Sequence, residues 1–419
     1  MTATTAPDEC RHHWGSLFHV KHIHKSVHNR GAGASYCGQF AVAPRVQPRR
    51  VTTFIAVIVA SALLLAGCGG VPVAAGWAAP VRLPDGSVLV QVKPGEVRAI
   101  DPASGAERWH FPNSVKNENS SKRVSKPVKG TFYAAPLLDR DRIYFVSYEG
   151  HLVRIDRPQG SNEILNPWTV DLGENVVATP ALAGGRLYVA TESGRVIVVN
   201  AEDGAKISTF DLGTGRIWSA PLISGEHLVV ASLDGKRTNS VRLSDGKMAW
   251  SVAESGASIA DVTTSGPNVL VGSLDSALYA HDAATGAVRW TFATDGWVTG
   301  TPLVAGDSIY LGTMGGSVYA LGLDGQQRWQ FTLDAEKPEF RSMPALVDGT
   351  LVAASRRGIV VGLDPANGLQ KWRAEVSDAR LDANPLVVDG SVLLATTKHA
   401  LIRVDASSGA TQQISGPGN

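Results

Sequence analysis

Residues 280–290 read Ala-His-Asp-Ala-Ala-Thr-Gly-Ala-Val-Arg-Trp, and close copies of this stretch occupy residues 99–109 and 362–372. Around these copies an anchor residue, usually a proline with an apolar neighbour, recurs at steps of 56, 44, 41, 41, 40, 42 and 41 residues. The anchors are Pro80, Pro136, Pro180, Pro221, Val262, Pro302, Pro344 and Pro385. A period of about 41 residues written eight times decides the fold, and a repeat array favours binding over catalysis because it usually works by presenting a surface.

Each repeat has the pattern of short β-strands. Apolar residues alternate instead of recurring every three or four positions, as at 186–190 and 195–199. Turn signals separate these runs, for example Asp348-Gly349 and Asp389-Gly390, where glycine accepts the positive φ of a tight hairpin. Three turns divide a repeat into four strands, and so short a period leaves no room for helices. The sequence therefore predicts an all-β protein.

The third turn of the repeat has an Asp or Asn followed four residues later by Gly. The pairs are Asp101/Gly105, Asp156/Gly160, Asn200/Gly204, Asp282/Gly286, Asp364/Gly368 and Asp405/Gly409. We expect the side chain to accept hydrogen bonds from the backbone NH groups that follow it, while the glycine takes the left-handed position. A metal array is the alternative, but Ca²⁺ needs six or more oxygens that converge on one point, so turn chemistry is favoured.

A large aromatic side chain follows the third turn in most repeats. The tryptophans are Trp109, Trp168, Trp250, Trp290, Trp329 and Trp372, and Phe210 substitutes in the third repeat. We expect these rings to act as packing wedges between neighbouring sheets. The last repeat has Gln413 at this place, which predicts its weakest seam.

Four-stranded units that stack through such wedges close naturally into a propeller, whose usual range of about four to eight blades includes the count here. The sequence therefore predicts an eight-bladed β-propeller of four-stranded antiparallel blades over residues 80–419. Two strands are candidates for the outer strand of the last blade, 411–415 from its own repeat or 71–75 from the N-terminal side. The second alternative would lock the ring.

The stretch 280–290 and its copies resemble the tryptophan-docking repeat of pyrroloquinoline-quinone-type propellers, with Asp, Thr-Gly and Trp at the expected places. The resemblance covers all eight repeats and implies the propeller fold. It is less informative about function, because that superfamily includes quinoprotein dehydrogenases and also cofactor-free lipoproteins, notably the propeller subunit of the bacterial outer-membrane β-barrel assembly machine.

The front of the chain has the pattern of an export signal. Arg49-Arg50 precede an apolar run, 51–66, that is too short to span a bilayer, and Leu65-Ala66-Gly67-Cys68 follows. This box resembles the lipobox of bacterial lipoproteins, which implies a signal peptide at 46–67 and diacylglycerol on Cys68. Residues 68–79 would then form a lipidated tether that holds the propeller to a membrane on its extracytoplasmic side. The general secretory route fits better than a twin-arginine signal.

Residues 1–45 are predicted to be a non-structural leader or the result of a misassigned start. No methionine occurs between Met1 and Met248, so initiation at a valine codon such as Val42 or Val46 would explain them. A metal tract is the alternative interpretation of the same residues, since they contain His12, His13, His19, His22, His24 and His28 with Cys10 and Cys37.

Composition argues against one class of function and against stabilisation by disulfides. Without residues 1–67 the chain has 32 basic and 36 acidic side chains, and this net charge near −4 argues against a nucleic-acid partner. Cys68 is then its one cysteine, so stability must come from packing and not from a disulfide.

The irregular first step contains a basic insertion, 113–130, with few apolar residues. Its positive side chains are Lys116, Lys122, Arg123, Lys126 and Lys129. A simply solvated loop is one interpretation. The other is contact with an acidic partner or with anionic lipid headgroups near the anchor.

These features predict a non-catalytic envelope scaffold that binds other proteins, with a monomeric propeller and no cofactor or metal. A more specific version of this prediction is a scaffold that takes part in outer-membrane protein assembly. The alternatives are a quinoprotein dehydrogenase, which would use pyrroloquinoline quinone with Ca²⁺, and a binder of cell-wall polymer or carbohydrate. Against the dehydrogenase, no catalytic residues or calcium ligands could be placed, and the long loops and paired cysteines of those enzymes are missing. For the carbohydrate binder, Trp77, Trp218 and Trp297 could stack on sugars, although burial beside the anchors is expected.

Overall fold

The computed structural model describes residues 78–93, 95–111, 130–157, 165–376, 380–397 and 401–415. The chain divides into two compact units, 1–69 and 70–419. The first unit lies outside the described residues, as do Cys68, Trp77 and the insertion up to residue 129. Every regular element of the described residues is a β-strand, and the strands form eight four-stranded sheets.

The first four blades each come from one continuous segment, and all neighbouring strands in them are antiparallel. Their strands are β1 (Val81–Arg82), β2 (Val88–Lys93), β3 (Glu96–Ile100), β4 (Glu107–Phe111), β5 (Leu137–Asp139), β6 (Arg142–Val146), β7 (His151–Asp156), β8 (Leu165–Asp171), β9 (Ala181–Ala183), β10 (Arg186–Ala190), β11 (Arg195–Asn200), β12 (Lys206–Asp211), β13 (Leu222–Ser224), β14 (His227–Ala231), β15 (Arg237–Arg242) and β16 (Met248–Ala253).

The last four blades repeat this arrangement. Their strands are β17 (Thr263–Ser265), β18 (Asn268–Ser273), β19 (Ala277–Asp282), β20 (Val288–Ala293), β21 (Leu303–Ala305), β22 (Ser308–Gly312), β23 (Ser317–Gly322), β24 (Gln327–Thr332), β25 (Ala345–Val347), β26 (Thr350–Ala354), β27 (Ile359–Leu363), β28 (Gln370–Glu375), β29 (Leu386–Val388), β30 (Ser391–Ala395), β31 (Leu401–Asp405) and β32 (Thr411–Ser415).

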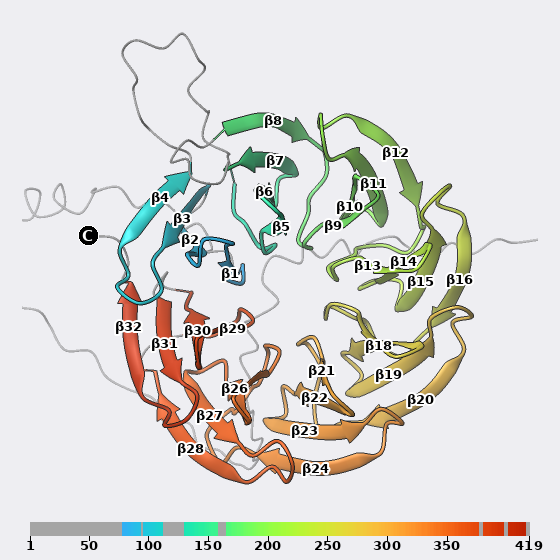
Figure 1. Ribbon diagram of the computed structural model, residues 1–419. Helices are drawn as coiled ribbons and strands as arrows, with labels where there is room; N and C mark the ends of the chain where they lie inside the picture. Colours follow the sequence, from blue (N-terminus) through green and yellow to red (C-terminus); the bar gives the residue numbers. More distant parts are fainter. Residues whose placement is uncertain are drawn as a thin grey trace, which may run out of the picture. The chain divides into compact units, whose positions relative to one another are not determined.

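The eight sheets are arranged around a ring, which confirms the predicted eight-bladed propeller (Figure 1). The first strand of each blade lies nearest the centre and the fourth on the circumference, as β13 and β16 show. The ring closes where β1 lies against β29. The eighth blade takes its outer strand, β32, from its own repeat, so the first of the two closing alternatives is the one observed.

The hydrophobic core lies between the sheets. The two middle strands of a blade are buried on both faces, and β23 is buried along its whole length. One core cluster joins Tyr310 and Val318 of the sixth blade to Leu351 and Val361 of the seventh. Each blade is therefore stabilised mainly by its two neighbours.

The Asp-to-Gly turns have the predicted geometry in five blades. In the fifth blade Asp282 Oδ1 accepts the NH groups of Ala284 and Thr285, and Gly286 has φ +76°. Asp101, Asn200, Asp364 and Asp405 accept backbone NH groups in the same way. In the second blade Asp156 instead pairs with Arg154, and the rest of that turn lies outside the described residues.

Candidate functional site

The outer tryptophans lie at the seams between blades. In five of the six seam tryptophans the indole NH donates to a backbone carbonyl in the third turn of the next blade. The pairs are Trp168–Glu202 (3.1 Å), Trp250–Ala283 (3.0 Å), Trp290–Leu323 (3.2 Å), Trp329–Pro365 (2.9 Å) and Trp372–Ala406 (2.8 Å). The ring packs on the glycine of that turn. A Cβ added to Gly368 would lie 2.6 Å from Trp329 Cε3, and one added to Gly246 would lie 2.1 Å from Phe210 Cδ1.

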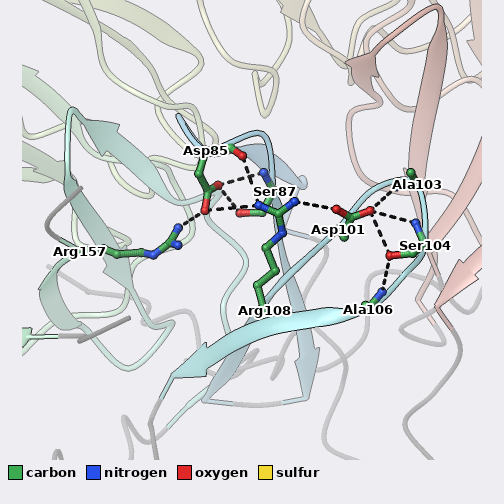
Figure 2. A network of polar contacts seen from close by, with 8 residues as sticks. All are labelled: Asp85, Ser87, Asp101, Ala103, Ser104, Ala106, Arg108 and Arg157. Atoms are coloured by element: carbon green, nitrogen blue, oxygen red, sulfur yellow. Dashed lines mark hydrogen bonds and ion pairs between the residues drawn. The ribbon is translucent and has the colours of Figure 1, made fainter. Parts of the chain in front are cut away.

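The seam between the first and second blades is built differently. Trp109 lies under the guanidinium of Arg157, whose Cζ is 5.5 Å from the ring centroid. Arg157 also pairs with Asp85, and Arg108 Nη2 donates to Asp101 Oδ2 at 2.6 Å (Figure 2). Burial alone would raise the pKa of Asp85, but hydrogen bonds from Ser87 and Arg157 outweigh it and lower that pKa. The Arg157–Asp85 ion pair thus joins these two blades.

Among the residues that the structure describes, no aromatic ring lies at the seam between the eighth and first blades. Gln413 is exposed, and Ile414 instead covers Gly105, where an added Cβ would lie 2.0 Å from the Ile414 carbonyl oxygen. Arg82 Nη2 donates to Asp389 Oδ1 at 3.2 Å across the same seam. The register changes between Leu401 and Ile402, which explains why Ile414 and not Gln413 takes the place at this seam.

One face of the propeller carries both the turns between second and third strands and the connections from one blade to the next. We call it the mouth face. A backbone hydrogen bond of 2.7 to 3.1 Å joins turn to connection in seven blades, with the pairs Tyr148–Thr131, Glu192–Asn175, Leu233–Arg216, Leu274–Ala257, Met314–Trp297, Arg356–Glu339 and Thr397–Arg380. These bonds fix the loops that surround the central channel.

The central channel is lined by residues from the three positions before each anchor, with between one and three such residues from each blade. They enclose a cavity of about 120 Å³. Directly before the anchors, backbone NH groups donate to the corresponding side chain of the next blade: Ala135 to Thr179 at 3.0 Å, Ala220 to Asp261 at 2.7 Å and Met343 to Asn384 at 2.9 Å. Burial raises the pKa of Asp261, although the Ala220 NH and the Thr301 hydroxyl oppose this. These bonds join the blades around the channel wall.

Charged side chains gather at the mouth of the channel over the seventh and eighth blades. The side chain of Asp382 is 5% exposed, and Arg356 Nε donates to it at 2.8 Å. Arg341 Nη1 and Arg380 Nη2 lie 3.4 and 3.6 Å from its two oxygens. Burial lowers the pKa of Arg341, while Asp382 opposes the shift.

Aromatic side chains and a carboxylate occupy the opposite part of the mouth, over the second to fourth blades. Glu192 accepts the Tyr148 hydroxyl at 2.9 Å and the Trp218 indole NH at 2.7 Å. Tyr133 and Tyr148 meet edge to face with ring centroids 5.5 Å apart. Burial, followed by the hydrogen bond to Glu192, raises the pKa of Tyr148 to about 12.

The sequence did not single out these channel residues, although a signal for them existed. A small residue precedes each anchor by two positions: Ala78, Ala134, Ala178, Ser219, Ala260, Gly300, Ser342 and Ala383. Four of these, Ala134, Ala178, Gly300 and Ala383, line the channel. The expected burial of Trp297 is wrong, since its side chain is 50% exposed in a connection on the mouth face. Trp218 is partly buried at the channel.

The channel cavity is small beside the pockets that usually hold a cofactor. A cavity of about 120 Å³ is below the about 300–1,000 Å³ of usual cofactor pockets. Calcium takes six or more oxygens, yet the residues that the structure describes contain no group of three or more His, Cys, Asp or Glu able to hold a metal. Nor does this part of the chain contain a helix that is long and apolar enough to cross a membrane.

The geometry defines a closed repeat propeller with a polar central channel and one face built from short loops. A family model described as "Outer membrane protein assembly factor BamB" matches residues 70–169, 165–270 and 245–419. The chain belongs to this family.

Curated relatives include several assembly factors. The chain is 25% identical over 256 residues to outer membrane protein assembly factor BamB of Moranella endobia (strain PCIT), an alignment that covers 55% of this chain and 65% of the relative. It is 26% identical over 260 residues to BamB of Yersinia pestis, covering 58% of each. Serine/threonine-protein kinase AfsK of Streptomyces griseus is 26% identical over 280 residues, which are 56% of this chain and 34% of the kinase. The chain thus spans about three fifths of the first two relatives.

Two solved structures share the fold. BamB from Moraxella catarrhalis matches with a TM-score of 0.59 and 16% identity, over 77% of this chain and 91% of that one. The computationally designed Ika8 protein matches with a TM-score of 0.62 and 13% identity, over 78% and 96%. At these identities the likeness shows the propeller fold alone.

Proposed function

We propose that this chain is an exported, lipid-anchored scaffold of the cell envelope that binds other envelope proteins and catalyses no reaction. Membership of the assembly-factor family is the observation that carries the proposal. The described ring supports it, because hydrogen bonds fix the loops of the mouth face from one blade to the next and present a rigid surface. A more specific form of the proposal is a role in outer-membrane protein assembly, the role that the names of the relatives state for those proteins.

The partners are the first thing to measure. Cross-linking in the native host followed by copurification should recover a defined set of envelope proteins, and charge reversal at Arg380 on the mouth face should reduce their yield. Recovery of outer-membrane proteins or their assembly factors would support the more specific form. A yield that is the same for the intact protein and for a denatured control would contradict the scaffold.

The anchor is tested at Cys68, which lies outside the described residues. Metabolic labelling with an alkyne analogue of palmitate should label the wild-type chain, and Cys68→Ala should remove the label and release the protein from membranes. Labelling of the wild-type chain with palmitate that lacks the alkyne is the control, because Cys68 is the one cysteine of the chain without residues 1–67.

The basic insertion is proposed to contact an acidic partner or anionic lipid headgroups. The structure describes Phe111 before the insertion and Gly130 at its end, and residues 113–129 lie outside the described residues. Replacement of Lys116, Lys122, Arg123, Lys126 and Lys129 with Gln should weaken partner or membrane association, increasingly so at low salt. Unchanged association would leave the insertion as a solvated loop.

A binder of cell-wall polymer is the second candidate, and exposed Trp297 favours it. Trp297→Ala should then abolish cosedimentation with purified wall material. The dehydrogenase has no such support, and addition of the quinone with Ca²⁺ should give neither tight binding nor dye reduction.

A further inference from the structure

Glu192 presents a carboxylate at the channel mouth that only neutral groups contact. Its donors are the Tyr148 hydroxyl at 2.9 Å, the Trp218 indole at 2.7 Å and the Asn175 amide at 3.4 Å. The nearby carboxylates Glu174 and Asp234 pair with Arg195 and Arg216, whereas no ion pair of Glu192 occurs within the described ranges. The protein therefore supplies hydrogen bonds to this charge from neutral donors, and the positive charge that also acts on it, Arg216, is paired with Asp234.

Aromatic rings form the walls beside this carboxylate. Tyr133 and Trp218 line the channel cavity, and Tyr148 meets Tyr133 edge to face. The cavity, about 120 Å³, exceeds the about 30 Å³ that one water molecule occupies. Aromatic walls with a carboxylate at one end are the usual surroundings of a bound organic cation, because the faces of the rings are negative.

The molecule already shows one cation at this wall. The Arg216 guanidinium lies over the Trp218 ring, with Cζ 5.8 Å from the centroid. Two hydrogen bonds, of 2.9 and 2.7 Å, tie the same guanidinium to Asp234, so Asp234 already neutralises its charge. Burial raises the pKa of Tyr133, and the charges of Glu149 and Glu192 raise it further.

We propose that Glu192, Trp218, Tyr148 and Tyr133 form a binding site for an organic cation of the ammonium or guanidinium class. The cation would enter from the mouth face, meet Glu192 and contact the aromatic rings. Its source is either a basic side chain of a polypeptide or the amine headgroup of a lipid, since both carry the same group.

Calorimetric titration of the purified chain with N-acetyl-lysine methylamide tests the site, and N-acetyl-norleucine methylamide is the neutral control of similar shape. The lysine probe should bind and the norleucine probe should not. Glu192→Gln should weaken the lysine probe about tenfold or more, because it removes the charge that meets the cation. Asp211→Asn is the matched control: it removes an exposed carboxylate that accepts the Gly213 NH, and it should leave the affinity unchanged.

Vesicles of phosphatidylethanolamine and of phosphatidylglycerol distinguish the two sources of the cation. Binding of the ethanolamine vesicles that is lost in Glu192→Gln would support the site with a lipid headgroup as its source, and binding of the lysine probe alone would support a polypeptide source. Equal binding of the lysine and norleucine probes, equal weakening by Glu192→Gln and Asp211→Asn, or no binding that depends on Glu192 would each overturn the proposal. Circular dichroism of each variant shows whether the fold is retained.

Discussion

At the scale of the residue, the seams depend on single rings that pack against single glycines. Trp329 is buried, donates its indole NH to the Pro365 carbonyl and covers Gly368. Removal of such a ring loses both the apolar burial and the hydrogen bond, and it leaves a cavity between two sheets. The seam tryptophans therefore have a structural role that is distinct from the polar groups of the channel mouth.

Trp329→Ala should lower the free energy of unfolding by about 3–5 kcal/mol, the usual range for a buried tryptophan. Urea denaturation followed by circular dichroism measures the change. Trp297→Ala is the control, because that ring is 50% exposed and should change stability by less than about 1 kcal/mol. Equal losses in the two variants would show that Trp329 is not a wedge.

Gly368→Ala should destabilise the protein more than Gly173→Ala. Both glycines have nearly the same left-handed backbone, φ +76° and +75°, so both pay the same strain of about 1–2 kcal/mol. Only Gly368 also meets a ring, since its added Cβ would lie 2.6 Å from Trp329 Cε3, whereas nothing lies within 4 Å at Gly173. The difference between the two melting temperatures isolates the contact with the ring, and equal values would contradict the packing described.

At the scale of the element, the third turn joins two strands through a charged cap. In the fifth blade Asp282 holds two backbone NH groups and pairs with Arg289 at 2.5 Å. The Arg289 guanidinium, followed by the Thr285 hydroxyl and NH, lowers the pKa of Asp282 from 3.8 to about 2. The folded turn therefore favours the ionised carboxylate.

The stability of this turn should depend on pH below 4. Because the folded pKa is depressed, the stabilising contribution is fully present above the unfolded value of 3.8 and is lost as the pH falls toward about 2. Asp282→Asn keeps an oxygen for the NH groups and removes the charge. The unfolding free energy of this variant should therefore fall less than that of the wild type as the pH is lowered over this range. Arg289→Gln removes the largest cause of the shift and should flatten the profile similarly. Profiles that superimpose on the wild type would contradict the argument.

The elements could be predicted from the sequence because each one depends on local rules. The period of the anchors, the alternation of apolar residues and the Asp-to-Gly spacing all act within one repeat, and the structure has the strands and turns they predict. Glu192, Trp218 and Tyr148 come from three different repeats, and their meeting depends on how the blades are placed around the ring. Ile414 was missed for a similar reason, since a register change in the last blade moves it onto Gly105.

At the scale of the whole molecule, a propeller has as many seams as blades, and it opens first at the weakest. The seam between the eighth and first blades has Ile414 where other seams have an indole or a phenyl ring. Its ion pair, Arg82–Asp389, is exposed on both sides, and such pairs contribute only about 0–1 kcal/mol. The first and last blades of the ring also meet there, so opening this seam need not break a continuous blade.

Native-state hydrogen exchange should therefore show the lowest protection in β32 and β1, and higher protection in the corresponding strands β20 and β21, whose blades are joined through Trp290. Arg82→Gln should change this order little, because the exposed ion pair contributes little. A substitution that weakens a different seam, Trp290→Ala, should lower the protection of β20 and β21 toward that of β32, since the indole NH to Leu323 and the ring on Gly325 are lost together. If β32 and β20 are equally protected in the wild type, then the stability of a blade is set by closure of the propeller and not by the aromatic side chain at its seam.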